Sequence, residues 1–241
     1  MLDLRSLVEG KLGLGDRFYL GAYAFYTSLF DPKRMNQRLG RRRRRLFEGR
    51  ARKAQAEMNA FLRNFPEVKL NLGCGEILIK GWINIDSRED VPGIDINYDL
   101  RLPLPLRDDA ADFIYNEHFL EHLAPDEGVK FLKECRRCLK PGGVLRVAMP
   151  HIKPVLDSYY KDELNSDLAR EMGVKTKAEL LNIGFKYWGH QWLYDEAETE
   201  RRLAEAGFEK VEQKRLNESD YPALRNLETR IGSELIYEAV K

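Results

Sequence analysis

The sequence contains no apolar run long enough to cross a membrane, and it contains few cysteines. A membrane-spanning helix needs about 18 or more consecutive apolar residues, and no run here reaches that length. No short apolar core followed by a small-residue cleavage site opens the chain, so no secretory signal is predicted. The three cysteines are an odd number, which favours reduced thiols. We therefore expect a cytoplasmic α/β protein of 241 residues, with one main domain and additions.

The cysteines also fail to form a recognisable metal motif. Cys135 and Cys138 have no second cysteine pair and no histidine at a suitable spacing, so they make a poor zinc site. We interpret both as half-buried packing residues on a helix, and we predict no metal centre.

The charges are divided unevenly along the chain. Residues 1–60 carry 14 Lys/Arg against 6 Asp/Glu, whereas residues 61–241 carry 26 against 33. An aromatic-rich stretch, 18–30, precedes five arginines at 41–45. An apolar face beside a polybasic cluster suits a peripheral membrane contact through 18–45. The alternative is that the aromatics cover the domain and the arginines are solvated. Nucleic-acid binding is disfavoured by the acidic body.

Strong helix formers without an internal proline predict a helix from about 41 to 64, ending before Pro66. An apolar run then breaks at Gly73-Cys74-Gly75, which predicts a buried strand followed by a tight turn that leaves room for a ligand. A second short strand, 81–86, ends in the carboxylate of Asp86. In a Rossmann-like unit, an acid at this place binds a ribose.

Two absences limit the nature of that ligand. Only nine residues, 73–81, join the two strands, so we expect a single turn or an irregular loop in place of the usual helix. Leu78 stands where a dinucleotide fingerprint has its third glycine. Both features disfavour a nicotinamide cofactor, whose pyrophosphate binds at a helix N-terminus. A ligand without phosphates fits better.

The rest of the chain alternates between strand and helix patterns. We predict strands at 94–98, 113–115, 144–150, from 208 and at 234–240, and helices at 132–140 and about 196–206. The segment 116–123 is interpreted as a helix start that places His118 and His122 on one face. Residues 151–189 form an aromatic-containing insertion that we interpret as a substrate cap.

Four motifs in this order resemble class I S-adenosylmethionine-dependent methyltransferases. They are the glycine turn at 71–75, the strand 81–86, the strand 112–115 with residues 120–123, and the loop 139–143. The resemblance is greatest to the small bacterial type-11 group, which is often found with surface-glycan biosynthesis. It implies a Rossmann-like seven-stranded, mostly parallel sheet with an antiparallel last strand and helices on both faces. The methyltransferase domain would span 65–241, after an N-terminal helical extension, 1–64.

The resemblance also implies S-adenosylmethionine as the cofactor. Asp86 would hold the ribose hydroxyls, while Asp99 and Leu100 would contact adenine. Asn71 departs from the acid that the family often has there, which puts a contact to the methionine ammonium in doubt. The cofactor residues predicted on this basis are Asn71, Gly73, Cys74, Gly75, Asp86, Asp99, Leu100 and Asn116.

The expected reaction is O-methylation of a sugar or another small hydroxyl acceptor. Such a hydroxyl needs help to lose its proton, so His118, His122 or His190 is the candidate general base. The alternative is that these histidines cap or pack helices. The rival functions are RNA methylation guided by 41–45, and a cofactor-binding or scaffold protein without catalysis. The sequence predicts no particular oligomeric state.

Overall fold

The computed structural model describes residues 2–3, 55–161, 170, 172–230 and 232–241. The hypothesis of membrane contact through 18–45 lies outside these residues, as does the part of the predicted helix before residue 55. Residues 55–62 are helical and are followed by a turn, which agrees with the predicted end before Pro66. Among the described residues, no helix is long and apolar enough to span a membrane.

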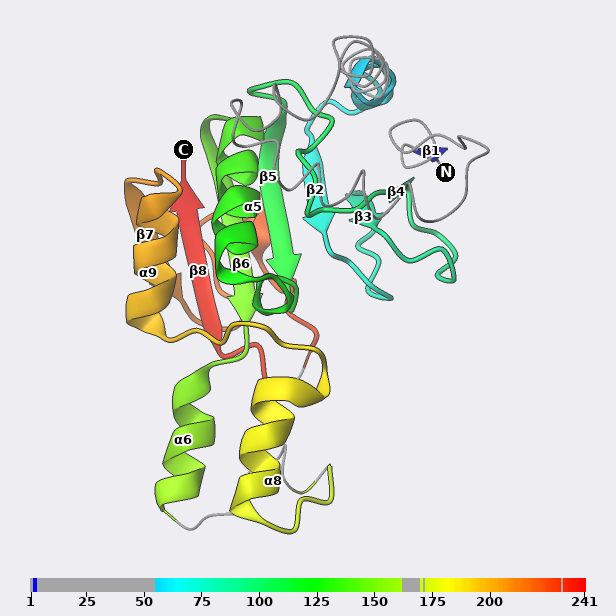
Figure 1. The fold of residues 1–241 in the computed structure, drawn as a ribbon. Helices are drawn as coiled ribbons and strands as arrows, with labels where there is room; N and C mark the ends of the chain where they lie inside the picture. The colour runs from blue at the N-terminus through cyan, green and yellow to red at the C-terminus, as the bar shows by residue number, and fades with distance from the viewer. Residues whose placement is uncertain (1, 4–54, 162–169, 171, 231) are drawn as a thin grey trace, which may run out of the picture.

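The sheet has eight strands, and its core is the one that the sequence predicts. In spatial order β1-β4-β3-β2-β5-β6-β8-β7, all neighbours pair in parallel except those of β8, which is antiparallel to β6 and β7. The seven strands β2 to β8 therefore confirm the Rossmann-like arrangement (Figure 1). A two-residue strand, β1, is added at the edge and was not predicted. The strands are β1 Leu2–Asp3, β2 Lys69–Leu72, β3 Ile83–Asp86, β4 Ile96–Asn97, β5 Ala111–Glu117, β6 Leu139–Met149, β7 Lys210–Lys214 and β8 Leu235–Val240.

Two α-helices, α5 (Pro125–Cys138) and α9 (Glu196–Glu205), pack on one face of the sheet (Figure 1). Proline at the first turn suits the start of α5, because its missing N–H has no partner there. The carboxylate of Glu127 accepts a hydrogen bond from the backbone N–H of Ala124 at 3.1 Å and satisfies that donor. Cys135 and Cys138 are packing residues, as predicted, but they are fully buried against the sheet and not half-buried.

The opposite face is covered by the segment 215–230, which contains the short 3₁₀ helix η3 (Pro222–Leu224). The connections 73–81 and 87–95 contain no helix, which confirms the expected loop after the first glycine. Arg146, on β6, binds both carboxylate oxygens of Glu228 at 2.6 and 3.0 Å. It also donates to Glu238 on β8 at 2.7 Å, and all three side chains are buried. This ion cluster joins the covering segment to the sheet.

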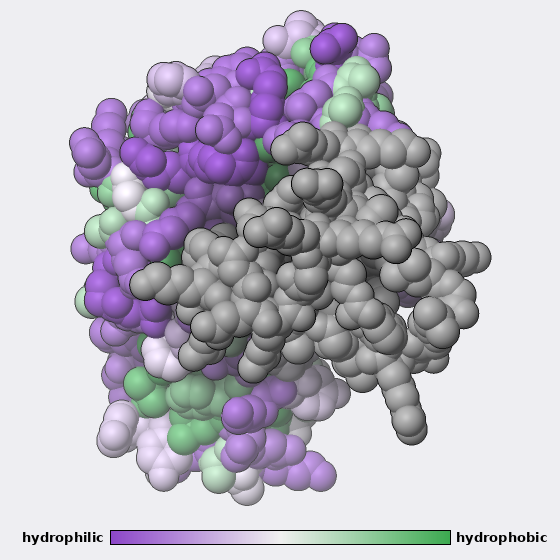
Figure 2. Space-filling view, turned by 45° about the horizontal axis from the view of Figure 1, so that its top comes forward, coloured by the Kyte–Doolittle hydropathy of each residue, from purple (hydrophilic) through white to green (hydrophobic). Residues whose placement is uncertain are grey.

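The described part of the insertion after β6 is mainly helical and lies beyond the carboxyl ends of the parallel strands (Figure 1). It contains α6 (Ile152–Tyr160), α8 (Lys177–Asn182) and the π-helix η2 (Ile183–Tyr187). Figure 2 shows a mainly hydrophilic surface with hydrophobic residues gathered at its lower end, the end at which Figure 1 places α6 and α8. That the insertion covers a substrate stays a prediction.

The helix predicted at 116–123 is wrong. β5 continues to Glu117, and the backbone N–H of His118 donates to the carbonyl of Ala148 at 2.9 Å. His118 then takes a positive φ of 51°, which turns the chain out of the strand. Only Leu120–His122 form a 3₁₀ turn, η1, so His118 and His122 do not share a helix face. The next helix also begins and ends earlier than predicted, at Pro125 and Cys138.

Candidate active site

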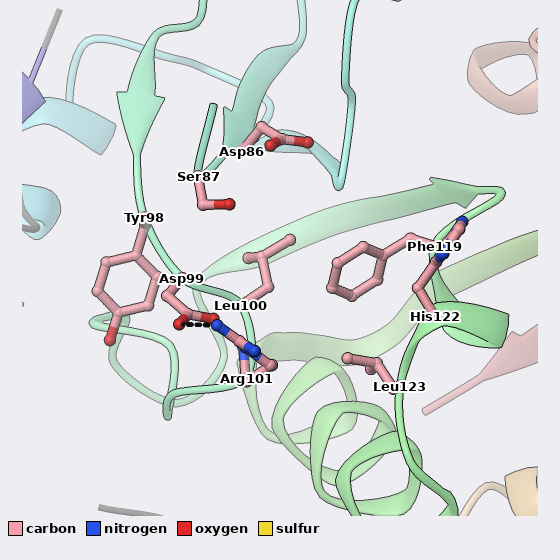
Figure 3. Close-up of a pocket in the computed structure, with 9 residues that line it drawn as sticks. All are labelled: Asp86, Ser87, Tyr98, Asp99, Leu100, Arg101, Phe119, His122 and Leu123. Atoms are coloured by element: carbon pink, nitrogen blue, oxygen red, sulfur yellow. Dashed lines mark hydrogen bonds and ion pairs between the residues drawn. The ribbon is translucent and has the colours of Figure 1, made fainter. Parts of the chain in front are cut away.

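A cavity of about 290 Å³ lies where β3 and β4 end (Figure 3). Asp86 is the last residue of β3, while Asp99 and Leu100 follow β4. Ligands of open α/β sheets bind at such carboxyl ends. The structure thus brings together the three residues predicted to bind ribose and adenine. The full lining is Asp86, Ser87, Tyr98, Asp99, Leu100, Arg101, Phe119, His122 and Leu123.

The carboxylate of Asp86 connects the cavity to the glycine turn. It accepts hydrogen bonds from the backbone N–H of Gly75 at 2.8 Å and of Arg88 at 3.0 Å. A carboxylate has about four acceptor positions, so two are left after these bonds. That number matches the two hydroxyl groups of a ribose.

Asp99 is already paired with a neighbouring side chain. Both of its oxygens accept from the guanidinium of Arg101, at 2.9 and 2.8 Å (Figure 3). A ligand amine that binds Asp99 must share its oxygens with Arg101 or displace it. Leu100 and Phe119 face each other across the cavity and supply apolar walls for a flat ring (Figure 3).

The glycine turn does not line this cavity, although it was expected to leave room for a ligand. Gly73 has a φ of 71°, and a Cβ built on it would lie 2.6 Å from the ring of Phe119. Phe119 therefore fills the space directly over Gly73. Cys74 is also buried, and burial raises the pKa of its thiol to about 12. A ligand that reaches the turn has to displace Phe119.

Gly73→Ala is expected to lower the free energy of unfolding by about 2–5 kcal/mol. A residue with a side chain loses about 1–2 kcal/mol in the left-handed backbone conformation. Inserting an extra atom into a filled space costs about a further 1–3 kcal/mol. Urea unfolding measures the change. Gly142→Ala is the matched control, because Gly142 has a φ of 79° and nothing within 4 Å of its Cβ position. If Gly73→Ala lowers the free energy of unfolding by no more than Gly142→Ala does, the close contact between Gly73 and Phe119 is wrong.

The two asparagines of the predicted cofactor set hold the backbone. The Asn71 amide donates to the carbonyl of Ile77 and to Asn84 Oδ1, each at 3.0 Å, so it fixes the loop 73–81. Asn116 Nδ2 donates to the carbonyl of Leu72 at 2.8 Å. Neither lines the cavity. Asn116 Oδ1 is buried without a hydrogen-bond partner in the part of the chain that the structure describes.

The three predicted histidines gather around a residue to which the sequence analysis gave no role, Glu121. Its carboxylate lies 3.6 Å from His118 Nδ1 and 4.0 Å from His122 Nε2. The rings of His122 and His190 are 5.0 Å apart between centroids. Although His118 and η1 follow β5 while His190 directly follows the insertion, these residues form one cluster, and His122 lines the cavity.

Burial sets the ionisation of this cluster. It lowers the pKa of His118 to about 4, although the charge of Glu117 acts in the opposite direction. It also lowers the pKa values of His122 and His190 and raises that of Glu121 to about 8. The imidazoles are therefore neutral at neutral pH, the form that accepts a proton. His118 is the weakest base of the three.

Glu117 and Arg230 join the segment 229–233 to the end of β5 and to the glycine turn. The Glu117 carboxylate accepts from the backbone N–H groups of Thr229 and Arg230, at 2.9 and 3.0 Å, and from the Ser233 hydroxyl at 2.7 Å. Burial acts to raise the pKa of Glu117, but these hydrogen bonds hold it below its usual value. Arg230 also donates to the carbonyl of Cys74 at 3.0 Å. The sequence signal for Glu117 was a carboxylate at the end of an apolar strand.

Residues 96–147 match the family model described as a methyltransferase domain. The chain is also 34% identical over 103 residues to a probable S-adenosylmethionine-dependent methyltransferase of Mycolicibacterium smegmatis. That match covers 41% of this chain and 38% of the relative, so the chain spans well under half the length of this relative.

Solved structures with a similar chain course include two proteins described as methyltransferases. One is an S-adenosylmethionine-dependent methyltransferase from Archaeoglobus fulgidus, with a TM-score of 0.44, 19% identity, and coverage of 81% of this chain and 98% of that one. The other is described as a possible histamine N-methyltransferase from Thermotoga maritima, with a TM-score of 0.45, 19% identity, and coverage of 79% and 90%. The fold assignment rests on the strand order of the chain itself. The family model and the curated relative both concern methyltransferases, and each matches less than half of this chain.

Proposed function

We propose that this protein transfers the methyl group of S-adenosylmethionine to a hydroxyl group of a sugar or another small acceptor in glycan biosynthesis. One observation supports the proposed binding of S-adenosylmethionine: Asp86, Asp99 and Leu100 line a single cavity at the ends of adjacent strands. In this proposal Asp86 binds the ribose hydroxyls, and Asp99 with Leu100 binds adenine. The methionine part of the cofactor reaches Gly73 after Phe119 moves aside.

Aromatic side chains on the insertion support a sugar acceptor. Those exposed there and just after it are Tyr159, Tyr160, Tyr187, Trp188 and Trp192. Flat aromatic faces pack against the C–H faces of sugar rings, and binding pockets for small molecules are rich in aromatic residues. Trp188 lies 5.7 Å from His190 between ring centroids, so part of this surface adjoins the histidine cluster.

Methyl transfer mainly requires that the acceptor oxygen is held in line with the sulfonium carbon. The carbon–sulfur bond breaks as the oxygen–carbon bond forms, and the acceptor loses a proton. His118, His122 and His190 are the candidates for taking that proton, because all three are neutral at neutral pH and adjoin the cavity or its edge. In the same proposal the protein acts in the cytoplasm and binds no nucleic acid.

Calorimetry of the full chain with S-adenosylmethionine tests the cofactor part. We expect one saturable site for S-adenosylmethionine and none for NAD, because the turn lacks a helix N-terminus for a pyrophosphate. A turnover screen with nucleotide sugars, lipid-linked glycans, RNA and small phenols then tests the acceptor. Absence of cofactor binding would refute the proposal. Methylation of RNA alone, or binding without any turnover, would favour the two rival functions.

A further inference from the structure

We propose that Glu121, His122 and His190 bind a divalent transition-metal cation of the zinc class. Each residue offers one ligand atom, and these three atoms lie within 4.8 Å of one another. Glu121 is completely buried, and neither of its carboxylate oxygens has a hydrogen-bond partner among the described residues. The inference rests on this juxtaposition.

The carboxylate of Glu121 is the strongest reason to expect a ligand. A buried carboxyl group without hydrogen bonds is costly even when it is neutral, and a buried charged one is generally paired or bound to a metal. The nearest histidine nitrogen, His118 Nδ1, lies 3.6 Å away, which is too long for a hydrogen bond. A cation between Glu121 and the two histidines would supply the missing partner for this side chain.

His190 is oriented as a metal ligand commonly is. Its Nδ1 lies 2.8 Å from the carbonyl oxygen of Gly184, and a carbonyl only accepts, so this nitrogen carries the proton. That leaves Nε2 with the lone pair that a metal needs. Such a backbone partner fixes the ring of a metal-binding histidine. Nε2 of His122 lies 4.0 Å from the Glu121 carboxylate.

The main chain holds the two segments of the cluster together. The backbone N–H groups of Gln191 and Trp192 both donate to the carbonyl of Glu121, at 2.8 and 3.1 Å. The side-chain amide of Gln191 donates to the carbonyl of His122 at 2.7 Å. The residues that follow His190 are thereby fixed to η1, which places the ligand atoms before any cation binds.

Two imidazoles and one carboxylate select the kind of cation. Imidazole nitrogen suits zinc, iron, copper and nickel, whereas magnesium and calcium prefer oxygen ligands. Two histidines and a glutamate also form a known catalytic zinc set that keeps a position open for water or substrate. Because His122 lines the cavity, the cation would lie at its edge. If the proposed methyl transfer is correct, an acceptor oxygen bound there would lose its proton more easily, and His118, which is not a ligand, would be the histidine left to take that proton.

The test is calorimetric titration of the full chain with ZnCl₂ and MgCl₂ in the absence of S-adenosylmethionine, with CoCl₂ absorbance as a second readout. We expect one equivalent of zinc, a visible absorption band with cobalt, and no heat of binding with magnesium. Glu121→Gln and His190→Gln should each weaken zinc binding by more than about 10-fold, since even the loss of a residue that supports a ligand costs that much.

His151→Gln is the matched control. His151 is the remaining histidine of the chain and lies 3.2 Å from Glu196, outside the cluster, so zinc binding should not change. Metal-free Glu121→Gln should melt no lower than the wild type, because it removes a buried carboxylate that lacks hydrogen bonds. Absence of saturable zinc binding would overturn the site. The same holds if Glu121→Gln and His190→Gln both bind zinc as tightly as the wild type does. Zinc binding without S-adenosylmethionine binding would refute only the proposed function.

Discussion

Arg146→Met is expected to destabilise the protein by about 3–5 kcal/mol, the usual cost of removing one partner from a buried ion pair. The change leaves the carboxylates of Glu228 and Glu238 buried without their cation. It also removes a donor to the carbonyl of Glu218, at 2.9 Å, in the segment 215–230. Guanidinium unfolding, followed by circular dichroism, measures the shift of the midpoint.

Arg201→Met is the matched control, because it makes the same replacement in an exposed ion pair on α9. Exposed pairs contribute only about 0–1 kcal/mol. Combining Arg146→Met with Glu228→Gln and Glu238→Gln should recover part of the loss, since no unpaired charge is then buried. A single Arg146→Met variant that unfolds like Arg201→Met would contradict the structural role of the cluster.

Asp86→Ala is expected to weaken S-adenosylmethionine binding by about 10- to 100-fold. A hydrogen bond to a charged group contributes about 1.5–3 kcal/mol, and 1.4 kcal/mol corresponds to a factor of ten in affinity. The loss includes the bond that Asp86 accepts from the Gly75 N–H, which holds the glycine turn. Calorimetry with the purified variant gives the dissociation constant directly.

Asp86→Asn separates the two contributions, because it keeps one acceptor oxygen of similar shape. We expect an intermediate affinity for this variant. Asp90→Asn is the control: Asp90 lies four residues further on, pairs with Arg88 and does not line the cavity. If Asp86→Ala binds the cofactor as tightly as Asp90→Asn does, Asp86 does not contact the ribose.

The sheet and the position of the cavity beside Asp86 could be predicted because their signals are local. Apolar runs mark β2, β5, β6 and β8, and a carboxylate at the end of a short strand marks Asp86. The predicted strand ended at Tyr115, two residues before the end of β5, because the polar residues after Tyr115 are also compatible with a helix. Pairing with β6 keeps Asn116 and Glu117 in the strand, and that pairing is not visible in the local pattern.

The polar clusters could not be predicted, because their members are far apart in the sequence. Arg146 stands 82 residues from Glu228 and 92 from Glu238, and only the charges inside apolar strands hint at such partners. The metal prediction considered Cys135 and Cys138, which are three residues apart in sequence, whereas the proposed ligands combine η1 with a residue beyond η2. The spacing of these residues along the sequence does not indicate that His190 lies beside Glu121 in the fold.

The contact between residues 191–192 and the carbonyl of Glu121 uses backbone N–H groups. Every residue except proline has such a donor, so this attachment tolerates almost any side chain at both positions. The side chains on the surface of the insertion can therefore change during evolution while the backbone contact with Glu121 is kept. A protein engineer can do the same: side chains of α6, α8 and η2 can be randomised while the backbone contact with Glu121 is kept.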